Sequence, residues 1–205
     1  MKVVIIGATG RTGRYLIEKA VAQGHIVTAF VRSAEKMKWP NSVAIMLGDA
    51  RNEADLVKAL KGQDAVLSAI GSIKINDGLT VRSTEALILA ADQTGVKRII
   101  MMSTFLATPS YRPNFIGRLV GGIMKSMVSD KQRGEELLKA SDLDWTIVYP
   151  TMLDKVKPGG SVRVVQEGEL VGMGNAIARI DVADFMVKAL ASPETIRKAV
   201  LITTR

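Results

Sequence analysis

Three glycines near the N-terminus have the spacing of a loop that binds phosphate groups. Gly7, Gly10 and Gly13 come directly after an apolar segment, Lys2 to Ile6, and directly before a helical pattern. Gly7 would allow the tight turn, Gly10 would let the backbone approach a pyrophosphate, and Gly13 would permit close contact between helix and strand. We therefore expect a dinucleotide at the N-terminal amides of the helix, the alternative being a turn that binds nothing. The loop residues expected to bind it are Gly7, Thr9, Gly10, Arg11, Thr12 and Gly13.

The residues at the end of the next apolar segment indicate which dinucleotide binds. Folds that bind NAD usually place an acidic residue there, about 20 residues beyond the loop, to hold the ribose 2′-hydroxyl. This chain has Arg32 and Ser33 at that place. A guanidinium there, joined by Arg11, would pair with a 2′-phosphate. The sequence thus favours NADP(H) over NAD(H); the alternative is that Arg32 is only a solvated charge at a strand end.

Three further segments follow apolar runs of strand length, and parallel sheets bind ligands at the carboxyl ends of their strands. The first would place the Asp49 carboxylate against the adenine amino group, and the second, Ser68 to Ser72, would run beneath the nicotinamide ribose. The third would place Ser103 at the nicotinamide ring. Each of these segments could also be a plain turn from strand to loop. The residues assigned to the cofactor on this ground are Asp49, Ala50, Ala69, Ile70, Gly71 and Ser103.

Short apolar runs alternate with helical patterns along most of the chain. Because the runs are apolar throughout rather than at every second residue, they predict strands buried on both faces. The pattern is typical of a doubly wound, Rossmann-like α/β fold, with helices on both faces of a parallel sheet. The expected strands are Lys2 to Ile6, Ile26 to Val31, Val43 to Leu47, Ala65 to Ile70, Val96 to Met102 and Trp145 to Val148. The expected helices are Arg14 to Gln23, Glu53 to Lys61, Val81 to Thr94 and Ile116 to Ser141.

The pattern is looser after Pro150. It predicts a short strand at Ser161 to Val165, a helix at Asp181 to Leu190 and a last strand at Val200 to Thr203. We expect a single domain over residues 1–205, in which residues 150–205 complete the sheet edge and the substrate pocket.

Composition excludes several classes of protein. The 205 residues include no Cys and one His, so a disulfide scaffold, a zinc finger, a thiol nucleophile and a multi-histidine metal site are ruled out, and we expect no metal. A formal net charge of +8 indicates an anionic partner or a solvated basic face, and the 4% aromatic content argues against nucleic acid. Because we find neither a signal peptide nor a bilayer-spanning segment, we expect a cytoplasmic monomer without a membrane partner.

The motifs together resemble a known family. They are GATGRTG from Gly7, the Val–Arg pair ending at Arg32, Gly–Asp–Ala before Arg51, and the run from Ser141 to Val148 before a proline. Ser103-x-Phe-Leu and Ile-Asp-Val-Ala-Asp-Phe from residue 180 complete the set. The sequence resembles the atypical short-chain dehydrogenases/reductases, and within them the biliverdin-IXβ reductase/flavin reductase type. The resemblance implies that NADPH passes hydride to a flavin or a linear tetrapyrrole.

Short-chain dehydrogenases that act on alcohols carry Tyr-x-x-x-Lys on the helix after the fifth strand. The matching stretch here is Met127-x-x-x-Lys131, so the lysine is present and the phenol is absent. A second match, Tyr15-x-x-x-Lys19, falls on the first helix, where we expect Tyr15 to pack against the sheet. Without a placed phenol, carbonyl reduction and sugar epimerisation lose their proton carrier, which leaves acceptors whose conjugated rings can spread the charge.

The resemblance also implies an acceptor site. Ser103 would hydrogen-bond the carboxamide or the acceptor, and Lys131 would attract phosphate or propionate groups. The residues implied to bind the acceptor are Phe105, Arg112, Arg118, Met127 and Met152. The alternatives are a solvated helix lysine and methionines that only fill the core.

Two functions of different class remain open. The first is an NADPH-dependent reductase of flavins, with biliverdin and quinones as other acceptors. The second is a non-catalytic NADP(H) sensor, which the absent tyrosine fits equally well but for which the chain has no added partner-binding extension.

Overall fold

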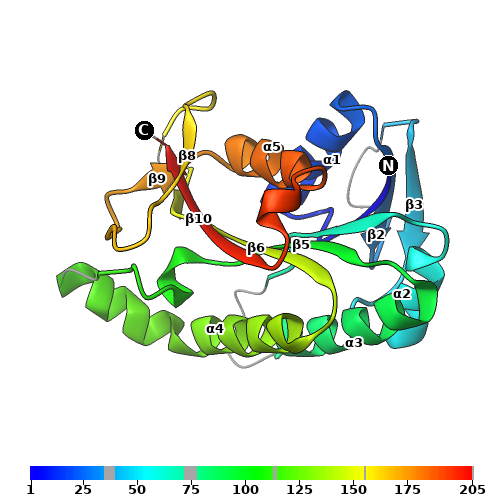
Figure 1. The fold of residues 1–205 in the computed structure, drawn as a ribbon, viewed down its shortest axis with the longest axis horizontal. Coiled ribbons are helices and arrows are strands. Elements are labelled where there is room, and N and C mark those ends of the chain that lie inside the picture. Colours follow the sequence, from blue (N-terminus) through cyan, green and yellow to red (C-terminus); the bar gives the residue numbers. More distant parts are fainter. Residues whose placement is uncertain (35–39, 72–77, 113–114, 155, 205) are drawn as a thin grey trace.

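An eight-stranded sheet with helices on both faces forms the molecule (Figure 1). This computed structural model describes residues 1–34, 40–71, 78–112, 115–154 and 156–204, with the backbone alone described over 115–123. The strands of the sheet are β1 (Lys2–Ile6), β2 (Ile26–Val31), β3 (Val43–Leu47), β4 (Ala65–Ser68), β5 (Arg98–Met102), β6 (Asp144–Pro150), β8 (Val162–Val164) and β10 (Lys198–Thr204). The α-helices are α1 (Arg11–Ala22), α2 (Glu53–Leu60), α3 (Leu79–Thr94), α4 (Phe115–Ala140) and α5 (Arg179–Ala189).

The strand order is β3-β2-β1-β4-β5-β6-β10-β8, and every neighbouring pair is parallel except β10 and β8. The chain runs outward from β1 to β3, crosses back to β4 and continues to the other edge. This reversal between β1 and β4 is the switch point of a doubly wound sheet, and the predicted fold class is confirmed. Ligands of such sheets bind at the carboxyl ends of the strands beside the switch point.

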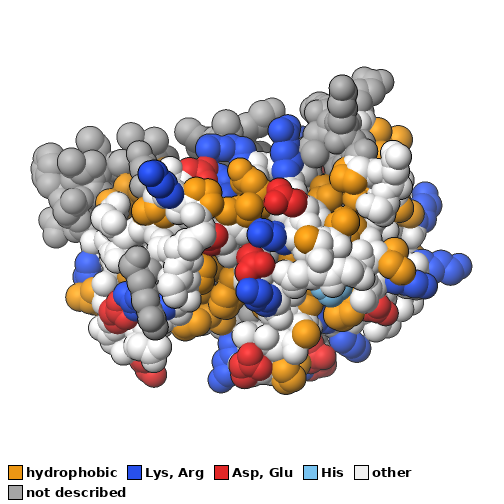
Figure 2. All heavy atoms as spheres, turned by 90° about the horizontal axis from the view of Figure 1, so that it is seen from above, with side chains coloured by type: hydrophobic (Ala, Val, Ile, Leu, Met, Phe, Trp, Pro, Cys, Tyr) orange, Lys and Arg blue, Asp and Glu red, His pale blue; other side chains and the backbone are white. Residues whose placement is uncertain are grey.

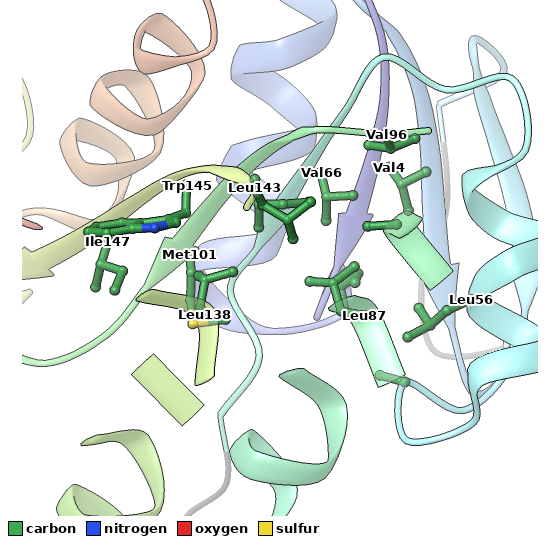
Figure 3. Packing of buried hydrophobic residues seen from close by; sticks show 14 of the residues in the cluster. Val4, Leu56, Val66, Leu87, Val96, Met101, Leu138, Leu143, Trp145 and Ile147 are labelled. Carbon is green, nitrogen blue, oxygen red and sulfur yellow. The ribbon is translucent and has the colours of Figure 1, made fainter. Parts of the chain in front are cut away.

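The core has two layers, one on each face of the sheet. Val4 and Ile6 of β1 point into the layer shared with α2, α3 and α4, while Val3 and Ile5 point into the layer shared with α1 and α5. Figure 3 shows part of the first layer, where Trp145 and Ile147 of β6 lie near Leu138 of α4. Both faces of the central strands are therefore covered, as the continuous apolar runs predict.

Most element boundaries lie within three residues of those expected from the sequence. The strands β1, β2 and β3 match their predicted bounds, whereas β4 ends at Ser68 rather than Ile70. Helix α1 begins at Arg11 rather than Arg14. The expectation for Tyr15 is wrong, because this side chain is 36% exposed on the outer side of α1 and does not pack against the sheet.

The last quarter of the chain extends the sheet. Strand β10 pairs with β6 in parallel, and β8 pairs with β10 to form the edge. Two short strands, β7 (Met152–Leu153) and β9 (Ala176–Ile177), pair beside the main sheet, and α5 packs against α1. Within the described ranges, no helix is both long enough and apolar enough to cross a membrane.

Candidate functional site

Two of the three loop glycines are required by backbone packing. Gly7 has φ +79°, a left-handed conformation, and a Cβ at this position would lie 2.9 Å from the carbonyl carbon of Ala69. A Cβ on Gly13 would lie 2.1 Å from the Gly7 carbonyl oxygen, which also accepts a hydrogen bond from the Gly10 amide at 2.9 Å. The loop therefore holds β1, β4 and the start of α1 in direct backbone contact.

Gly10 has a different reason to be small. It is the N-cap of α1, has an ordinary φ of −71°, and a Cβ there would meet only the Gly7 oxygen, at 3.0 Å. No side chain caps the helix, and its first turn holds no acidic residue. The first N–H groups of α1 and the positive end of its dipole are thus open to an anion, and a pyrophosphate group fits this cradle.

A pocket of about 170 Å³ extends from this loop across the ends of β2, β3 and β4. It brings together Gly7, Thr9, Gly10, Arg32, Asp49, Ala50, Ala69, Ile70 and Gly71, all of them predicted from the sequence. It is also lined by Ile6, Phe30, Val31, Gly48 and Leu79, which were not predicted. A Cβ on Gly48 would lie 2.6 Å from the Phe30 ring, so this glycine lets the aromatic side chain form the pocket wall.

Two arginines, Arg32 and Arg51, lie at the end of this pocket that would hold the adenosine. Arg32 is exposed, and the structure gives its side chain no hydrogen bond or ion pair with another described residue. Asp49 accepts hydrogen bonds from Arg51 Nε at 3.0 Å and from Arg51 Nη2 at 2.5 Å. These bonds, with a contribution from the Arg32 charge, lower the pKa of Asp49 to about 2. Arg51 was not among the residues predicted for this site. Ser33, which was, is half-buried and does not line the pocket.

Arg11 and Thr12 belong to a separate group of side chains. Arg11 Nη2 and Arg179 Nε both donate to Asp154 Oδ2, each at 2.6 Å, and Arg179 Nη1 lies 3.3 Å from Thr12 Oγ1. Neither Arg11 nor Thr12 lines the pocket that contains Arg32, so the expected pairing of Arg11 with the same phosphate is not seen. Figure 2 shows the face over α1 and α5, where basic and acidic side chains are interspersed.

Lys131 lies at the other end of the pocket and is buried. Only 8% of the residue is exposed, and its Nζ donates to the carbonyl oxygens of Ile70 at 3.4 Å and Met102 at 3.3 Å. Burial lowers the pKa of Lys131, although the nearby carboxylates of Glu135 and Asp130 oppose this shift. The structure therefore does not support the alternative of a solvated helix lysine. The ammonium group lies between the ends of β4 and β5, where a nicotinamide ribose is expected.

Ser103 is part of a buried polar cluster that the sequence analysis missed. Its Oγ donates to Glu135 Oε1, and the Tyr149 hydroxyl donates to Glu135 Oε2 at 2.5 Å. Burial first, and then the bond to Glu135, raise the pKa of Tyr149, so its hydroxyl remains a donor. Glu135 follows Lys131 by four residues on α4, a spacing that puts both side chains on one helix face and that could have revealed the pair.

The expected acceptor residues are more dispersed. Phe105 is 4% exposed and packs edge-to-face on Tyr111 with ring centroids 5.2 Å apart, so it is part of the core. Met152 is half-buried against the same core, and Met127 is half-buried on α4. The Arg112 guanidinium is exposed and donates to the carbonyl oxygen of Pro109. The side chain of Arg118 lies outside the described residues, and no metal-binding group of three or more His, Asp or Glu occurs within them.

Comparisons with known proteins give the same family as the motifs. The model of the NAD(P)H-binding family matches residues 7–193. An uncharacterized chloroplastic protein of Arabidopsis thaliana is 30% identical, over 100% of this chain and 77% of that protein. An isoflavone reductase homolog of the same plant is 27% identical, over 98% of this chain and 68% of that protein.

Solved structures agree with this result. An oxidoreductase of Lactococcus lactis has a TM-score of 0.84 and 26% identity, covering 100% of this chain and 91% of that one. An Escherichia coli protein described as an anaerobillin reductase has a TM-score of 0.83 and 21% identity, covering 98% of this chain and 96% of that one. At this identity the likeness shows the fold alone. The NAD(P)H-binding family that the resemblance implies is confirmed, as is a nicotinamide dinucleotide as the cofactor. The chain belongs to the NAD(P)H-binding family.

Proposed function

We propose that this protein is an NADPH-dependent reductase whose acceptor is a small conjugated molecule, with flavins first among the candidates. One observation carries the proposal. A single pocket connects the open N-terminus of α1 with Gly71, where a Cβ would lie 3.8 Å from the buried ammonium of Lys131. A dinucleotide laid along this pocket would have its phosphates at the loop and its nicotinamide near Lys131 and Ser103.

Each part of the cofactor has its own group of residues in this proposal. The amides after Gly10 bind the pyrophosphate, and Arg32 takes the 2′-phosphate, with Ser33 nearby. Asp49 remains ionised and accepts from the adenine amino group. The backbone of Ala69, Ile70 and Gly71 supports the nicotinamide ribose. The preference for NADPH over NADH therefore depends on Arg32.

The chemistry in this proposal is hydride transfer. When bound, NADPH supplies a hydride at the C4 position of its nicotinamide. Lys131 fixes the ribose end of the site, and the Ser103 hydroxyl lies where the carboxamide or the acceptor would be. The protein thus contributes mainly proximity and orientation. Flavins suit such a site because the charge left by hydride is spread over their ring system.

The family and the relatives support a reductase more than a sensor. Several relatives have names that describe reductases, including a probable pinoresinol-lariciresinol reductase of Arabidopsis thaliana. The buried polar groups at Lys131 and Ser103 also favour an enzyme. Burying them lowers the free energy of unfolding, and cofactor binding alone does not require buried polar groups at these positions. A monomer that takes small molecules and no nucleic acid is part of the proposal, and a cytoplasmic location stays a prediction.

The proposal is tested by following NADPH oxidation with FMN, biliverdin and a quinone in separate reactions, alongside NADPH binding without acceptor. Turnover with FMN supports the reductase. Tight NADPH binding without turnover on any of the three acceptors contradicts it and supports the sensor.

A further inference from the structure

A second cavity lies beside the proposed reaction site. It has a volume of about 610 Å³ and is bounded by α4, by the segment after β5 and by the edge formed by β10 and β8. Its polar lining consists of Thr108, Ser110, Gln132, Glu135, Glu136, Lys139, Tyr149, Gln166 and Glu167. Such a lining is suited to water. The cofactor pocket shares none of these residues.

Glu135 connects this cavity with Ser103. The residue is only 3% exposed, yet its side chain is part of the cavity wall. Oε1 accepts from Ser103 at the end of β5, and Oε2 accepts from Tyr149 of β6 at 2.5 Å. Lys139 Nζ lies 3.7 Å from Oε2 and 3.5 Å from the Tyr149 hydroxyl, and the Lys139 side chain is 40% exposed. An unbroken set of proton-carrying groups therefore runs from the cavity to Ser103.

Acceptors differ in whether they need a proton together with the hydride. Hydride addition to an oxidised flavin gives an anion whose charge is spread over the ring system. Hydride addition to a quinone or a conjugated carbonyl leaves a charge localised on oxygen, which a proton donor stabilises strongly. The sequence offers no tyrosine for this purpose, because Met127 occupies its place.

We propose that Glu135, acting through Ser103, delivers the proton that accompanies hydride transfer, which extends the proposed function to quinones and conjugated carbonyls. The inference rests on that function. The acceptor takes the hydride from NADPH and the Ser103 hydroxyl proton. Ser103 regains a proton through the Glu135 carboxylate, which receives it from the Lys139 ammonium, 3.7 Å from Oε2. Lys139, which lines the cavity, then recovers its proton from water there. In sum, one NADPH and one solvent proton reduce one quinone to a hydroquinone.

Glu135 touches neither cofactor nor acceptor, so its test needs a readout that loss of structure alone would not change. We compare Glu135→Gln with the wild type on two acceptors, menadione as the quinone and FMN as the flavin. The glutamine keeps the size of the side chain and one of its two accepting oxygens, but its amide cannot relay a proton. We expect kcat with menadione to fall about 100-fold, as for loss of a general acid, and kcat with FMN to stay within about twofold.

Glu136→Gln is the matched control. This neighbouring residue also lines the cavity, carries the same charge and is exposed, and it has no part in the cluster around Ser103. We expect both rates to remain at the wild-type level. The Kd for NADPH should be unchanged in both variants, because neither residue lines the cofactor pocket.

A measurement on the wild type avoids any dependence on the folding of a variant. Turnover of menadione should be slower in D₂O than in H₂O, and turnover of FMN should show a smaller effect. Equal solvent isotope effects with the two acceptors would overturn the inference. So would a Glu135→Gln variant that loses both activities equally, or neither.

The outcomes separate this inference from the proposed function. A wild type that reduces FMN but not menadione overturns the proton relay and leaves the reductase standing. A wild type that reduces neither overturns both. Reduction of both acceptors by the wild type, with loss of menadione activity alone in Glu135→Gln, supports both.

Discussion

The Gly10→Ala substitution separates cofactor binding from folding. The backbone of Gly10 has φ −71° and ψ 165°, which alanine adopts without strain, and the new Cβ would meet only the Gly7 oxygen, at 3.0 Å. The free energy of unfolding should therefore change by less than about 1 kcal/mol. The same methyl group lies where a pyrophosphate would approach the N-terminus of α1. Loss of one charge-assisted hydrogen bond there costs about 1.5–3 kcal/mol, or about 10- to 150-fold in the Kd for NADPH.

Two other glycines provide the controls. A Cβ on Gly13 would lie 2.1 Å from the Gly7 oxygen and 2.8 Å from Ala8 Cα, and neither backbone atom can move freely. Gly13→Ala should therefore lower the unfolding free energy by about 1–3 kcal/mol or more. Gly24 has φ +78° with nothing within 4 Å, so Gly24→Ala should cost about 1–2 kcal/mol through strain and leave NADPH affinity unchanged.

The assays are thermal unfolding and a fluorescence titration with NADPH on the same three variants. The expected result is a normal melting temperature with weak binding for Gly10→Ala, and a lowered melting temperature with normal binding for Gly24→Ala. If Gly10→Ala binds NADPH within twofold of the wild type, the dinucleotide does not approach this loop and the site is misassigned.

Three further substitutions test other parts of the structure. Arg32→Ala should weaken the binding of NADPH by about 1.5–3 kcal/mol and the binding of NADH only slightly. An equal loss of affinity for both cofactors in paired titrations would contradict the 2′-phosphate role. Burial lowers the pKa of Lys131 below its ordinary value of 10.5. Between these two pKa values the unfolded chain binds more protons than the folded one, so the free energy of unfolding rises with pH over that window. Lys131→Met should abolish that rise in urea unfolding and stabilise the protein at neutral pH. Arg98 is 8% exposed and donates to Asp144 O, Ala189 O and Thr195 Oγ1, so Arg98→Met should cost about 3 kcal/mol in the same assay without changing the Kd for NADPH.

The sequence predicts those parts of the fold that depend on local patterns. The bounds of β1 and β2 follow from continuous apolar runs, because strands covered on both faces have no polar side. Strand β3 has such a run too, although it lies at the sheet edge with Ile45 and Leu47 exposed. The start of α1 was placed three residues late. Gly13 reads as a poor helix former, yet it is helical here because its missing side chain allows contact with Gly7.

The candidate site is predictable where a single segment provides it, and less so where distant segments meet. Nine predicted cofactor residues line one pocket because they all follow strand ends. The cluster around Glu135 joins residues that are 32 and 14 positions away, and Asp154 meets Arg11 across 143 positions. Such contacts are set by the packing of α4 and of the C-terminal strands, which no spacing along the chain encodes.

The central claim is that this chain passes hydride from NADPH to an acceptor, and a single-turnover experiment with deuterated NADPH tests it most directly. The enzyme is mixed with FMN and with NADPH that carries deuterium at one or the other of its two C4 positions. The account predicts that deuterium at one of these positions, and not at the other, slows the oxidation of NADPH. It also predicts much slower oxidation of NADH under the same conditions. Oxidation of NADPH no faster than in the absence of protein would contradict the claim.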